Sequence, residues 1–172
     1  MRVRPALKGV PRFVVDVNLG RLARYLRLLG FDCLYRNDFD DAAIAGIAYA
    51  EGRVVLTRDR TLLRRKAIVY GYYVREVQPK KQAVVVLQRF GLSRRIAPFS
   101  RCTYCNGSLQ KIDKASVDHR LEPLTRKYYQ DFLICPDCAR VYWQGSHLAR
   151  AEQLLRELTG CAEQSACSDH SM

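Results

Sequence analysis

The sequence lacks a long apolar run, and no stretch approaches the roughly 20 residues that a membrane-spanning helix needs. The longest candidates, residues 13–17 and 83–87, are far too short. The basic N-terminal segment 1–12 also lacks the apolar core of a secretory signal, so secretion is not expected. We therefore predict a soluble, cytoplasmic protein that has no membrane partner.

Acidic residues are scarce relative to basic ones. The 172 residues include 17 Asp and Glu against 29 Lys and Arg, which gives a formal net charge of +12 at pH 7. Hydrophobic residues make up 48% of the chain, which is enough for a core and excludes wholesale disorder. Because the positive charge is large for so small a chain, we expect a nucleic-acid partner rather than a basic protein that merely repels itself.

Disulfide bonds are not expected, because the seven cysteines are an odd number and nothing in the sequence indicates an oxidising compartment. Four of them instead form two matched pairs, Cys102 with Cys105 and Cys135 with Cys138, which are separated by 29 residues. Two such pairs can complete a tetrahedral Cys₄ zinc site. Four protein ligands leave no open position, so we predict a structural zinc ion. A thioredoxin-like redox role needs only one such pair, opening a helix, and is disfavoured.

Strand and helix patterns alternate through the first half of the chain. Short β-branched or apolar runs predict strands, and apolar residues at helical spacing predict the helices between them. The expected strands are 13–17, 31–36, 53–57 and 72–77, and the expected helices are 19–29, 42–51, 61–66 and 79–90. This alternation predicts a three-layer α/β fold with a central parallel sheet.

The composition changes after this first domain. Residues 93–100 are basic, contain a proline and are expected to form a linker, after which cysteines, polar turns and short strands follow. An inserted loop around 114–127 would explain the long gap between the cysteine pairs. Apolar spacing over 153–158 predicts a final helix, and the small polar residues of 160–172 predict a flexible tail. The expected domains are 10–92 and 101–159.

Aspartates follow the first three predicted strands. Asp16 ends the first strand, Asp38, Asp40 and Asp41 follow the second, and Asp59 follows the third. The carboxyl ends of adjacent parallel strands share one edge of a sheet, where ligands bind, so these side chains can converge on one site. Carboxylates that are packed together repel one another, and a hard cation such as Mg²⁺ or Mn²⁺ relieves that repulsion. Such ions can activate water for phosphodiester hydrolysis.

Structural roles for these aspartates are also open. Asp is common at helix N-caps and in turns, so Asp41 can be a cap, and Asp38 and Asp40 can be turn formers. Asp16 is different, because an acid joined directly to a buried apolar strand needs a partner or a metal.

Arginines flank the aspartates in the sequence. Arg21 follows Asp16 in the chain, and Arg58 and Arg60 enclose Asp59. An acidic pocket with a basic rim suits a polyphosphate substrate, whose phosphates these three arginines would bind. The neighbouring Arg24 and Arg27 fit a solvated helix face at least as well.

The segment after the second cysteine pair contains the only tryptophan, Trp143. We interpret Trp143 as part of a packed zinc-ribbon strand, although an aromatic surface that stacks on RNA is the alternative. The role of His147 stays open between the two.

These motifs together resemble the Mut-seven C-terminal ribonuclease (Mut7-C) domain family over roughly residues 12–158. The resemblance is carried by Asp16 with the following LGRLARYLR, by GFD, by Asp41 before a helix, by GRVVLTRDR, by the two cysteine pairs and by VYWxGSH. It implies a PIN-like nuclease domain over 10–92 followed by a Cys₄ zinc ribbon over 101–159. It also implies metal-dependent cleavage of RNA at a PIN-type acidic centre.

The resemblance carries over to individual acidic residues. Asp16, Asp41 and Asp59 match the acidic positions of the family, with Asp40 as a neighbouring alternative to Asp41. PIN-type sites often contain a fourth acid, and the nearest one here, Glu76, falls within a predicted strand. The ligand set for Mg²⁺ or Mn²⁺ is therefore expected to be the three aspartates.

The sequence thus predicts a ribonuclease that hydrolyses phosphodiester bonds in an RNA such as tRNA or rRNA. Two other hypotheses stay open. A non-catalytic RNA-binding module with a degenerate acidic site would bind RNA without metal-dependent turnover. A protein-interaction adaptor would use the zinc ribbon as its docking surface, and its positive charge would be incidental.

Overall fold

The structure is a computed structural model that describes residues 9–143 and 145. The chain divides into two compact units, residues 1–97 and 98–172, and the division falls inside the segment 93–100 that was predicted as a linker. That segment contains a short 3₁₀ turn, Ser93–Arg95. The predicted final helix over 153–158 and the predicted tail over 160–172 lie outside the described residues.

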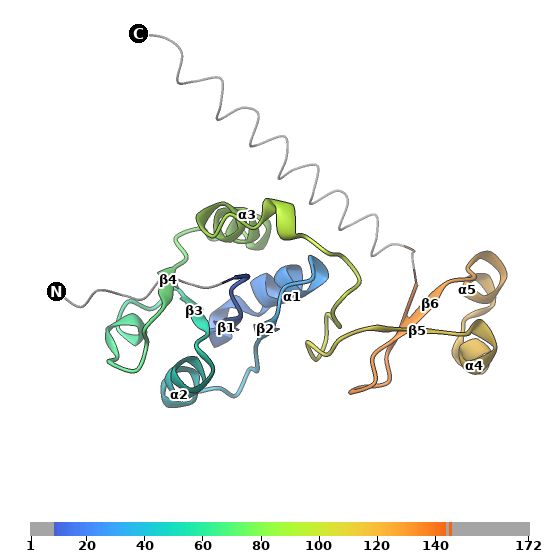
Figure 1. The fold of residues 1–172 in the computed structure, drawn as a ribbon, viewed down its shortest axis with the longest axis horizontal. Coiled ribbons are helices and arrows are strands. Elements are labelled where there is room, and N and C mark those ends of the chain that lie inside the picture. Colours follow the sequence, from blue (N-terminus) through green and yellow to red (C-terminus); the bar gives the residue numbers. More distant parts are fainter. Residues whose placement is uncertain (1–8, 144, 146–172) are drawn as a thin grey trace, which may run out of the picture. The chain divides into compact units, whose positions relative to one another are not determined.

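The first unit is built on a four-stranded parallel sheet with the strand order β2-β1-β3-β4 (Figure 1). Its strands are β1 (Phe13–Val15), β2 (Cys33–Leu34), β3 (Val54–Thr57) and β4 (Gly71–Tyr73). Every residue of β1 and β3 is buried, as expected for central strands that are covered on both faces. The prediction of an α/β fold with a central parallel sheet is therefore confirmed.

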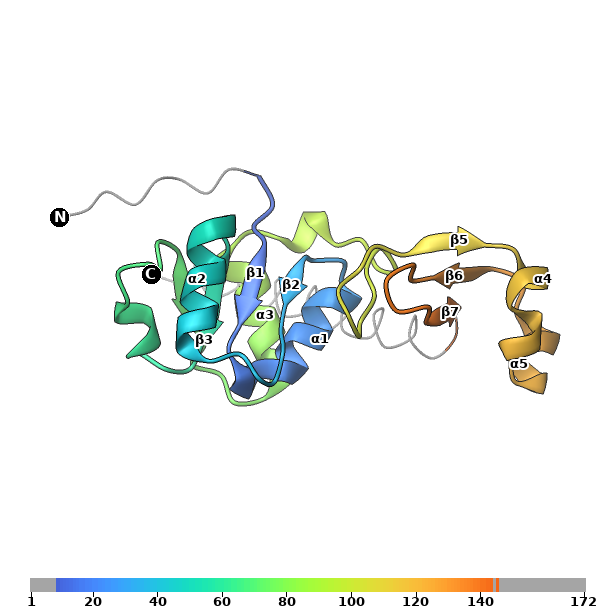
Figure 2. The same ribbon diagram turned by 90° about the horizontal axis from the view of Figure 1, so that it is seen from below.

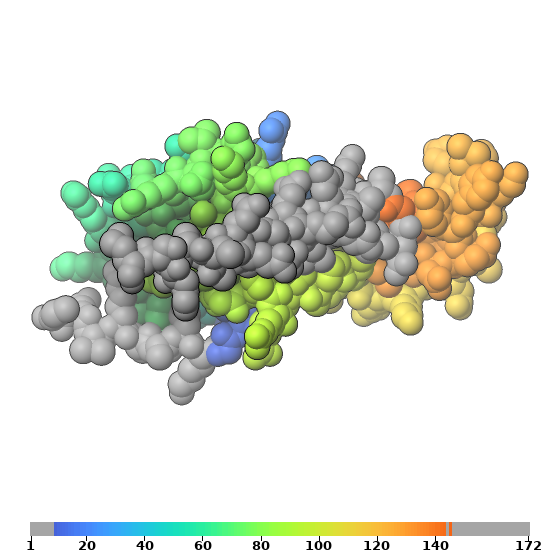
Figure 3. All heavy atoms as spheres, turned by 90° about the horizontal axis from the view of Figure 1, so that it is seen from above, coloured from blue at the N-terminus to red at the C-terminus, as the bar shows by residue number. Residues whose placement is uncertain are grey.

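Helices cover both faces of this sheet. They are α1 (Gly20–Leu28), α2 (Asp41–Glu51) and α3 (Pro79–Arg89). Figures 1 and 2 show α2 on one face and α1 with α3 on the other, and Figure 3 looks onto the face that α3 covers. The α2 helix ends at Gly52, whose backbone is left-handed (φ 63°), a conformation that glycine adopts at little cost. The expected helix over 61–66 is only a 3₁₀ turn, Leu62–Arg64.

The two faces of the sheet have separate cores. Val14 and Val55 pack with Ile44 and Ala48 of α2 in one cluster of buried residues. On the opposite face, the ring of Phe13 contacts the ring of Phe90 edge to face, at a centroid distance of 5.5 Å. Successive side chains of a strand alternate between faces, which places Phe13 and Val14 on opposite sides of the sheet. All the strands pair in parallel, so their carboxyl ends lie along one edge.

A buried ion pair closes the opposite, amino-terminal edge of the sheet. Arg53 donates to the Asp32 carboxylate at 2.6 Å, to the Phe13 carbonyl at 3.1 Å and to the Glu51 carboxylate at 2.7 Å. Burial favours a lower pKa for Arg53, but its bonds to Asp32 and Glu51 outweigh this effect and raise the pKa. Arg53 and Asp32 belong to the GRVV and GFD motifs, so these parts of the sequence pattern stabilise the fold.

Arg27 is also buried, which the helical pattern alone did not require. Its guanidinium donates to the carbonyl of Cys33 at 2.8 Å and to that of Tyr35 at 3.4 Å. The interpretation of Arg27 as part of a solvated helix face is therefore wrong. Its side chain is buried and donates hydrogen bonds to carbonyls in and just after the edge strand β2. Arg24 on the same helix is exposed, as that interpretation expected.

The second unit contains an antiparallel sheet with the strand order β5-β6-β7. The strands are β5 (Gln110–Ile112), β6 (Phe132–Ile134) and β7 (Val141–Trp143). The insertion between β5 and β6 was expected to be a loop, but it is largely helical, with α4 (Lys114–Val117), a 3₁₀ turn (Asp118–Arg120) and α5 (Pro123–Tyr128). Its buried Val117 and Leu121 pack against Phe132, and this apolar contact is why the insertion folds.

No helix within the described parts of the chain is both long enough and apolar enough to cross a membrane.

Candidate functional site

Asp16 lies directly after β1, at the carboxyl edge of the parallel sheet, and is only 6% exposed. Its Oδ2 accepts a hydrogen bond from the hydroxyl of Thr57 at 2.6 Å. Within the described residues, no cationic side chain pairs with this carboxylate and its Oδ1 has no hydrogen-bond donor. Among the described residues, every polar side-chain atom that is cut off from solvent has a hydrogen-bond partner. Oδ1 of Asp16 has none, so it must be reachable from solvent. Asp16 therefore offers one free oxygen in a largely buried position.

Thr57 connects Asp16 to the next predicted acid, Asp59. Thr57 is fully buried at the end of β3, and its hydroxyl accepts a hydrogen bond from the backbone N–H of Asp59 at 2.8 Å. The Asp59 carboxylate in turn accepts from the backbone N–H of Thr61 at 2.6 Å, while its side chain stays exposed. The role of Thr57 was not identified from the sequence. Its place two residues before Asp59, in the motif TRD, could have indicated that role.

Asp40 and Asp41 have different roles at the start of α2. Asp40 is the N-cap, because its Oδ1 accepts a hydrogen bond from the backbone N–H of Ala43 at 2.7 Å. Asp41 is the first residue of the helix, and its half-exposed carboxylate pairs with Arg65 at 3.3 Å. The capping role considered for Asp41 thus belongs to Asp40, while the Asp41 side chain pairs with Arg65.

Two further acids lie along the same edge. Asp38 forms two hydrogen bonds with Arg36, at 2.9 and 2.6 Å, and these bonds lower its pKa. Glu76 follows β4, which ends at Tyr73, so it lies in the connection to α3 and not within a strand as predicted. An acid therefore follows each of the four strands at the carboxyl edge.

These acids do not form one compact cluster. Among the described residues, only the four cysteines form a group of three or more Cys, His, Asp or Glu side chains close enough to hold one metal ion. The structure thus brings Asp16, Thr57 and Asp59 together through hydrogen bonds, but leaves Asp41 in its own contact with Arg65.

A basic pocket of about 490 Å³ lies at the carboxyl edge. Arg21 and Arg24 of α1 and Arg58 after β3 line it, and Tyr35 and Gln82 are among its other walls. Within the described residues, none of the three arginines has an acidic partner. The predicted phosphate-binding residues Arg21 and Arg58 therefore line one pocket, although Asp16 and Asp59 are not among its lining residues.

The third predicted phosphate-binding residue, Arg60, lies in a different environment. Its guanidinium stacks on the ring of Tyr73 at 4.9 Å. With Arg75 and Leu63, it lines a separate pocket of about 630 Å³ next to β4. Arg58 and Arg60 thus face two different basic pockets, although only Asp59 separates them in the sequence.

The four predicted zinc ligands come together in the second unit. Their sulfur atoms all lie within 4.8 Å of one another, with 3.6 Å between Cys102 and Cys138 and 3.4 Å between Cys105 and Cys135. Sulfur atoms bonded tetrahedrally to zinc at about 2.3 Å would lie roughly 3.8 Å apart. The four cysteines are therefore placed to bind a metal ion such as zinc.

The two cysteine turns have the same backbone geometry. In each turn, the N–H of the first cysteine donates to the carbonyl five residues later, Gly107 or Arg140. In each, the residue after the second cysteine has a left-handed backbone, with φ 77° at Asn106 and 56° at Ala139. Glycine suits position 107, because an added Cβ would displace the exposed Asp137 carboxylate and approach the Cys135 sulfur to 3.0 Å.

The cysteines differ in their electrostatic surroundings. Burial by itself raises the pKa of Cys102, but hydrogen bonds from the Cys105 backbone N–H and the Tyr142 hydroxyl outweigh burial and lower that pKa to about 6. Burial raises the pKa of Cys105. Because thiolates are the ligands that bind a metal, the hydrogen bonds that lower the pKa of Cys102 favour its metal-binding form.

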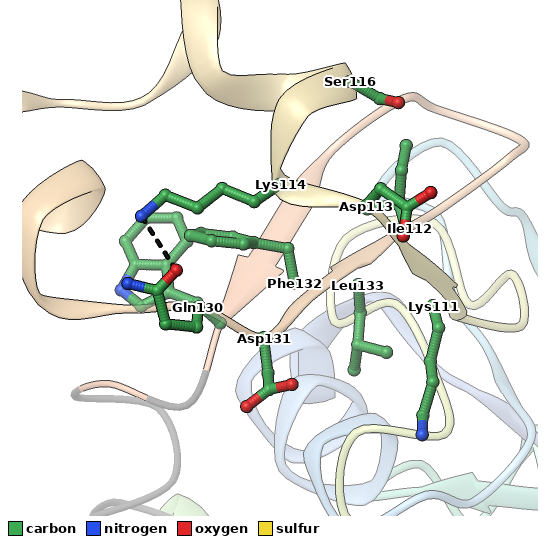
Figure 4. A pocket seen from close by; sticks show the side chains of 10 residues that line it. Lys111, Ile112, Asp113, Lys114, Ser116, Gln130, Asp131, Phe132 and Leu133 are labelled. Carbon is green, nitrogen blue, oxygen red and sulfur yellow. Dashed lines mark hydrogen bonds between the residues drawn. The ribbon is translucent and has the colours of Figure 1, made fainter.

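The second unit also contains a pocket of about 590 Å³ beside β5 and β6. Figure 4 shows Lys114 and Gln130 hydrogen-bonded on one side of Phe132, with Lys111 and Asp131 further along the pocket. Trp143 lines this pocket and packs in the apolar cluster with Phe132 and Tyr129. Trp143 therefore belongs to a packed strand, while His147 lies outside the described residues.

A family model described as the Mut7-C RNAse domain matches residues 11–155. Comparison with curated proteins and with solved structures gives no significant match.

Proposed function

The chain belongs to the Mut7-C RNAse domain family, and from this membership we propose that it is a metal-dependent ribonuclease with a PIN-like nuclease domain. Its substrate class is RNA, and its reaction is hydrolysis of a phosphodiester bond. The observation that carries the proposal is the Asp16 carboxylate, which is 6% exposed and has one free oxygen and no cationic partner among the described residues. A largely buried carboxylate with a free oxygen favours a bound cation, because the cation offsets the cost of burying its charge.

The donor set of the carboxyl edge fits Mg²⁺ or Mn²⁺, because carboxylate oxygens are the ligands that these ions prefer. Asp16 and Asp59 would hold the ion, with Asp41 as the third ligand. A bound ion of this type activates water and neutralises charge on the reacting phosphate. Thr57 fixes the orientation of Asp16 through its 2.6 Å hydrogen bond, and Arg21 and Arg58 bind neighbouring phosphates. Arg60 binds a phosphate further along the strand, in the pocket beside β4.

We further propose that the four cysteines bind a structural zinc ion. Cys102 and Cys135 are fully buried and form, with Tyr142, the apolar cluster that joins the cysteine turns to the sheet β5-β6-β7. A metal bound there would stabilise a unit whose own apolar core is small. We propose that the zinc unit also binds RNA.

The test is cleavage of end-labelled RNA by the wild type and by Asp16→Asn. Protein depleted of Mg²⁺ but still containing zinc is assayed with and without Mg²⁺ or Mn²⁺ on tRNA, rRNA fragments and single-stranded RNA. EDTA alone would not be decisive, because it also removes zinc. We expect metal-dependent cleavage by the wild type and none by Asp16→Asn.

Asp38→Asn is the matched control, because Asp38 lies at the same edge but is exposed and already paired with Arg36. Its cleavage should equal that of the wild type. Full cleavage by a highly purified Asp16→Asn preparation would refute the proposed site.

A non-catalytic RNA-binding module is the second candidate function. It is favoured by the fact that Asp16, Asp41 and Asp59 do not form a compact group in the structure. It predicts salt-sensitive RNA binding with no cleavage by either protein with any metal.

A further inference from the structure

The basic pocket at the carboxyl edge is also lined by a polar residue that the proposed chemistry does not use. This residue is Gln82, in the first turn of α3. Gln82 is only 4% exposed, although it lines the pocket. A polar atom of such a side chain needs a hydrogen-bond partner in the protein or contact with water.

The amide nitrogen of Gln82 has two partners. It donates to the carbonyl of Glu76 at 2.9 Å and to that of Val77 at 3.2 Å, which ties the loop after β4 to α3. Because both partners are acceptors, they determine which end of the amide is nitrogen. The oxygen accepts no hydrogen bond from any residue that the structure describes. Every side-chain oxygen that is cut off from solvent in those residues has a hydrogen-bond partner, so the Gln82 oxygen must be accessible to solvent. Gln82 thus lines the pocket and carries a solvent-accessible oxygen on an amide group whose nitrogen is held in place.

The other walls of the pocket are positively charged or aromatic. Arg21, Arg24 and Arg58 provide donors for a phosphate. The ring of Tyr35 is held in place, because its hydroxyl donates to the Val17 carbonyl at 3.2 Å and its edge lies over Gly20. A Cβ at Gly20 would come within 2.6 Å of that ring, so this wall requires glycine.

We propose that this pocket binds one ribonucleotide of the RNA strand, with the arginines on its phosphate and the Gln82 oxygen accepting a hydrogen bond from its ribose 2′-hydroxyl. This inference rests on the proposed RNA substrate and adds the residue that selects RNA over DNA. The volume of about 490 Å³ is within the range of small-molecule sites. The 2′-hydroxyl is the donor that distinguishes the two nucleic acids, and a fixed acceptor beside a phosphate site is placed to read it.

The experiment measures binding, so that it is independent of cleavage. A short fluorescent RNA is titrated with the zinc-loaded protein in the absence of Mg²⁺ and Mn²⁺. The same RNA is then made with a single 2′-deoxy or 2′-fluoro substitution at each position in turn. Fluorine keeps the ribose-like sugar pucker but removes the donor, so it separates the hydrogen bond from an effect of sugar shape.

We expect one position at which both substitutions weaken binding about fivefold to tenfold, the factor that one hydrogen bond between neutral groups contributes. With Gln82→Met, that position should lose its sensitivity, so that ribose and deoxyribose bind equally. Gln82→Asn, which withdraws the oxygen by one methylene group, is the second variant in case Gln82→Met fails to fold. Arg58→Gln is the matched control and should weaken all the RNAs equally.

Three results would overturn the inference. The first is the absence of any position sensitive to both substitutions. The second is a sensitivity that persists in a folded Gln82 variant. The third is a dependence on the base and not on the sugar, which would assign the donor to a base amino group. Cleavage of unmodified RNA is measured separately, so failure of the nuclease proposal and failure of ribose recognition are distinguishable.

Discussion

Thr57 has no charge, yet its hydroxyl contacts two parts of the proposed site. It donates to the Asp16 carboxylate and accepts from the Asp59 backbone N–H. Donation to one oxygen of Asp16 leaves the other oxygen directed toward solvent, and acceptance from Asp59 holds the loop that carries the second acid. Thr57 is therefore a positioning residue for both aspartates.

Replacement of Thr57 tests this role. Thr57→Val keeps the shape of the side chain but removes both hydrogen bonds, and Thr57→Ser restores them. We expect Thr57→Val to reduce Mn²⁺ affinity or cleavage about 10- to 100-fold, as loss of a group that orients a metal ligand does. Thr57→Ser should recover most of the activity. Cleavage rates at several Mn²⁺ concentrations provide the measurement, and equal reduction in both variants would contradict the prediction.

The paired cysteine turns act at the scale of a structural element. They pack on β6 and β7 through a cluster that contains only Cys102, Cys135 and Tyr142 as buried members. Ala139 holds a left-handed backbone (φ 56°) that costs a residue with a Cβ about 1–2 kcal/mol. A cluster this small offers little hydrophobic stabilisation to offset that strain, so the metal is the expected source of stability.

Removal of the metal should therefore unfold the second unit alone. Trp143 is the only tryptophan and lies on β7, so its fluorescence reports on this unit. We expect a chelator to change the Trp143 emission toward that of an exposed indole, and added Zn²⁺ to reverse the change. The helical circular dichroism of the first unit should largely remain. A fluorescence spectrum that is unchanged after zinc is shown to be lost would contradict the prediction.

At the scale of the whole molecule, some arginines are paired with acidic residues and others are not, among the residues that the structure describes. The net charge of +12 is a property of the full chain, but Arg53 is neutralised in a buried pair and Arg36 in an exposed one. Arg21, Arg24 and Arg58 have no acidic partner in the described part of the chain and share one pocket. RNA affinity should therefore depend on particular arginines and not on net charge alone.

Salt dependence measures this difference. The logarithm of the RNA association constant should fall linearly with the logarithm of salt concentration, by about 0.7 for each phosphate contacted on a single strand. Arg58→Gln should make the slope shallower by about that amount, because one contact is lost. Arg36→Gln removes the same charge from a residue already paired with Asp38 and should leave the slope unchanged. Equal slopes for the two variants would contradict the assignment of Arg58 to a phosphate.

The α/β pattern, the four-stranded parallel sheet and the cysteine pairs were predictable, because periodicity and CxxC spacing are local properties. The burial of Arg27 was not, since it depends on carbonyls that β2 leaves without partners. The helical insertion between β5 and β6 was expected as a loop, because its apolar residues, Val117 and Leu121, are too few to give a clear periodicity.

The sequence alone thus indicates which four cysteines can bind a metal ion and where strands and helices alternate, because these features depend on residue type and on spacing along the chain. The tertiary structure decides which of these residues meet. It joins Thr57 to Asp16 across 41 positions, assigns Arg58 and Arg60 to different pockets, and places Gln82 in the lining of one pocket with three arginines. Such contacts depend on the packing of segments that are far apart in the chain, and no local pattern encodes them.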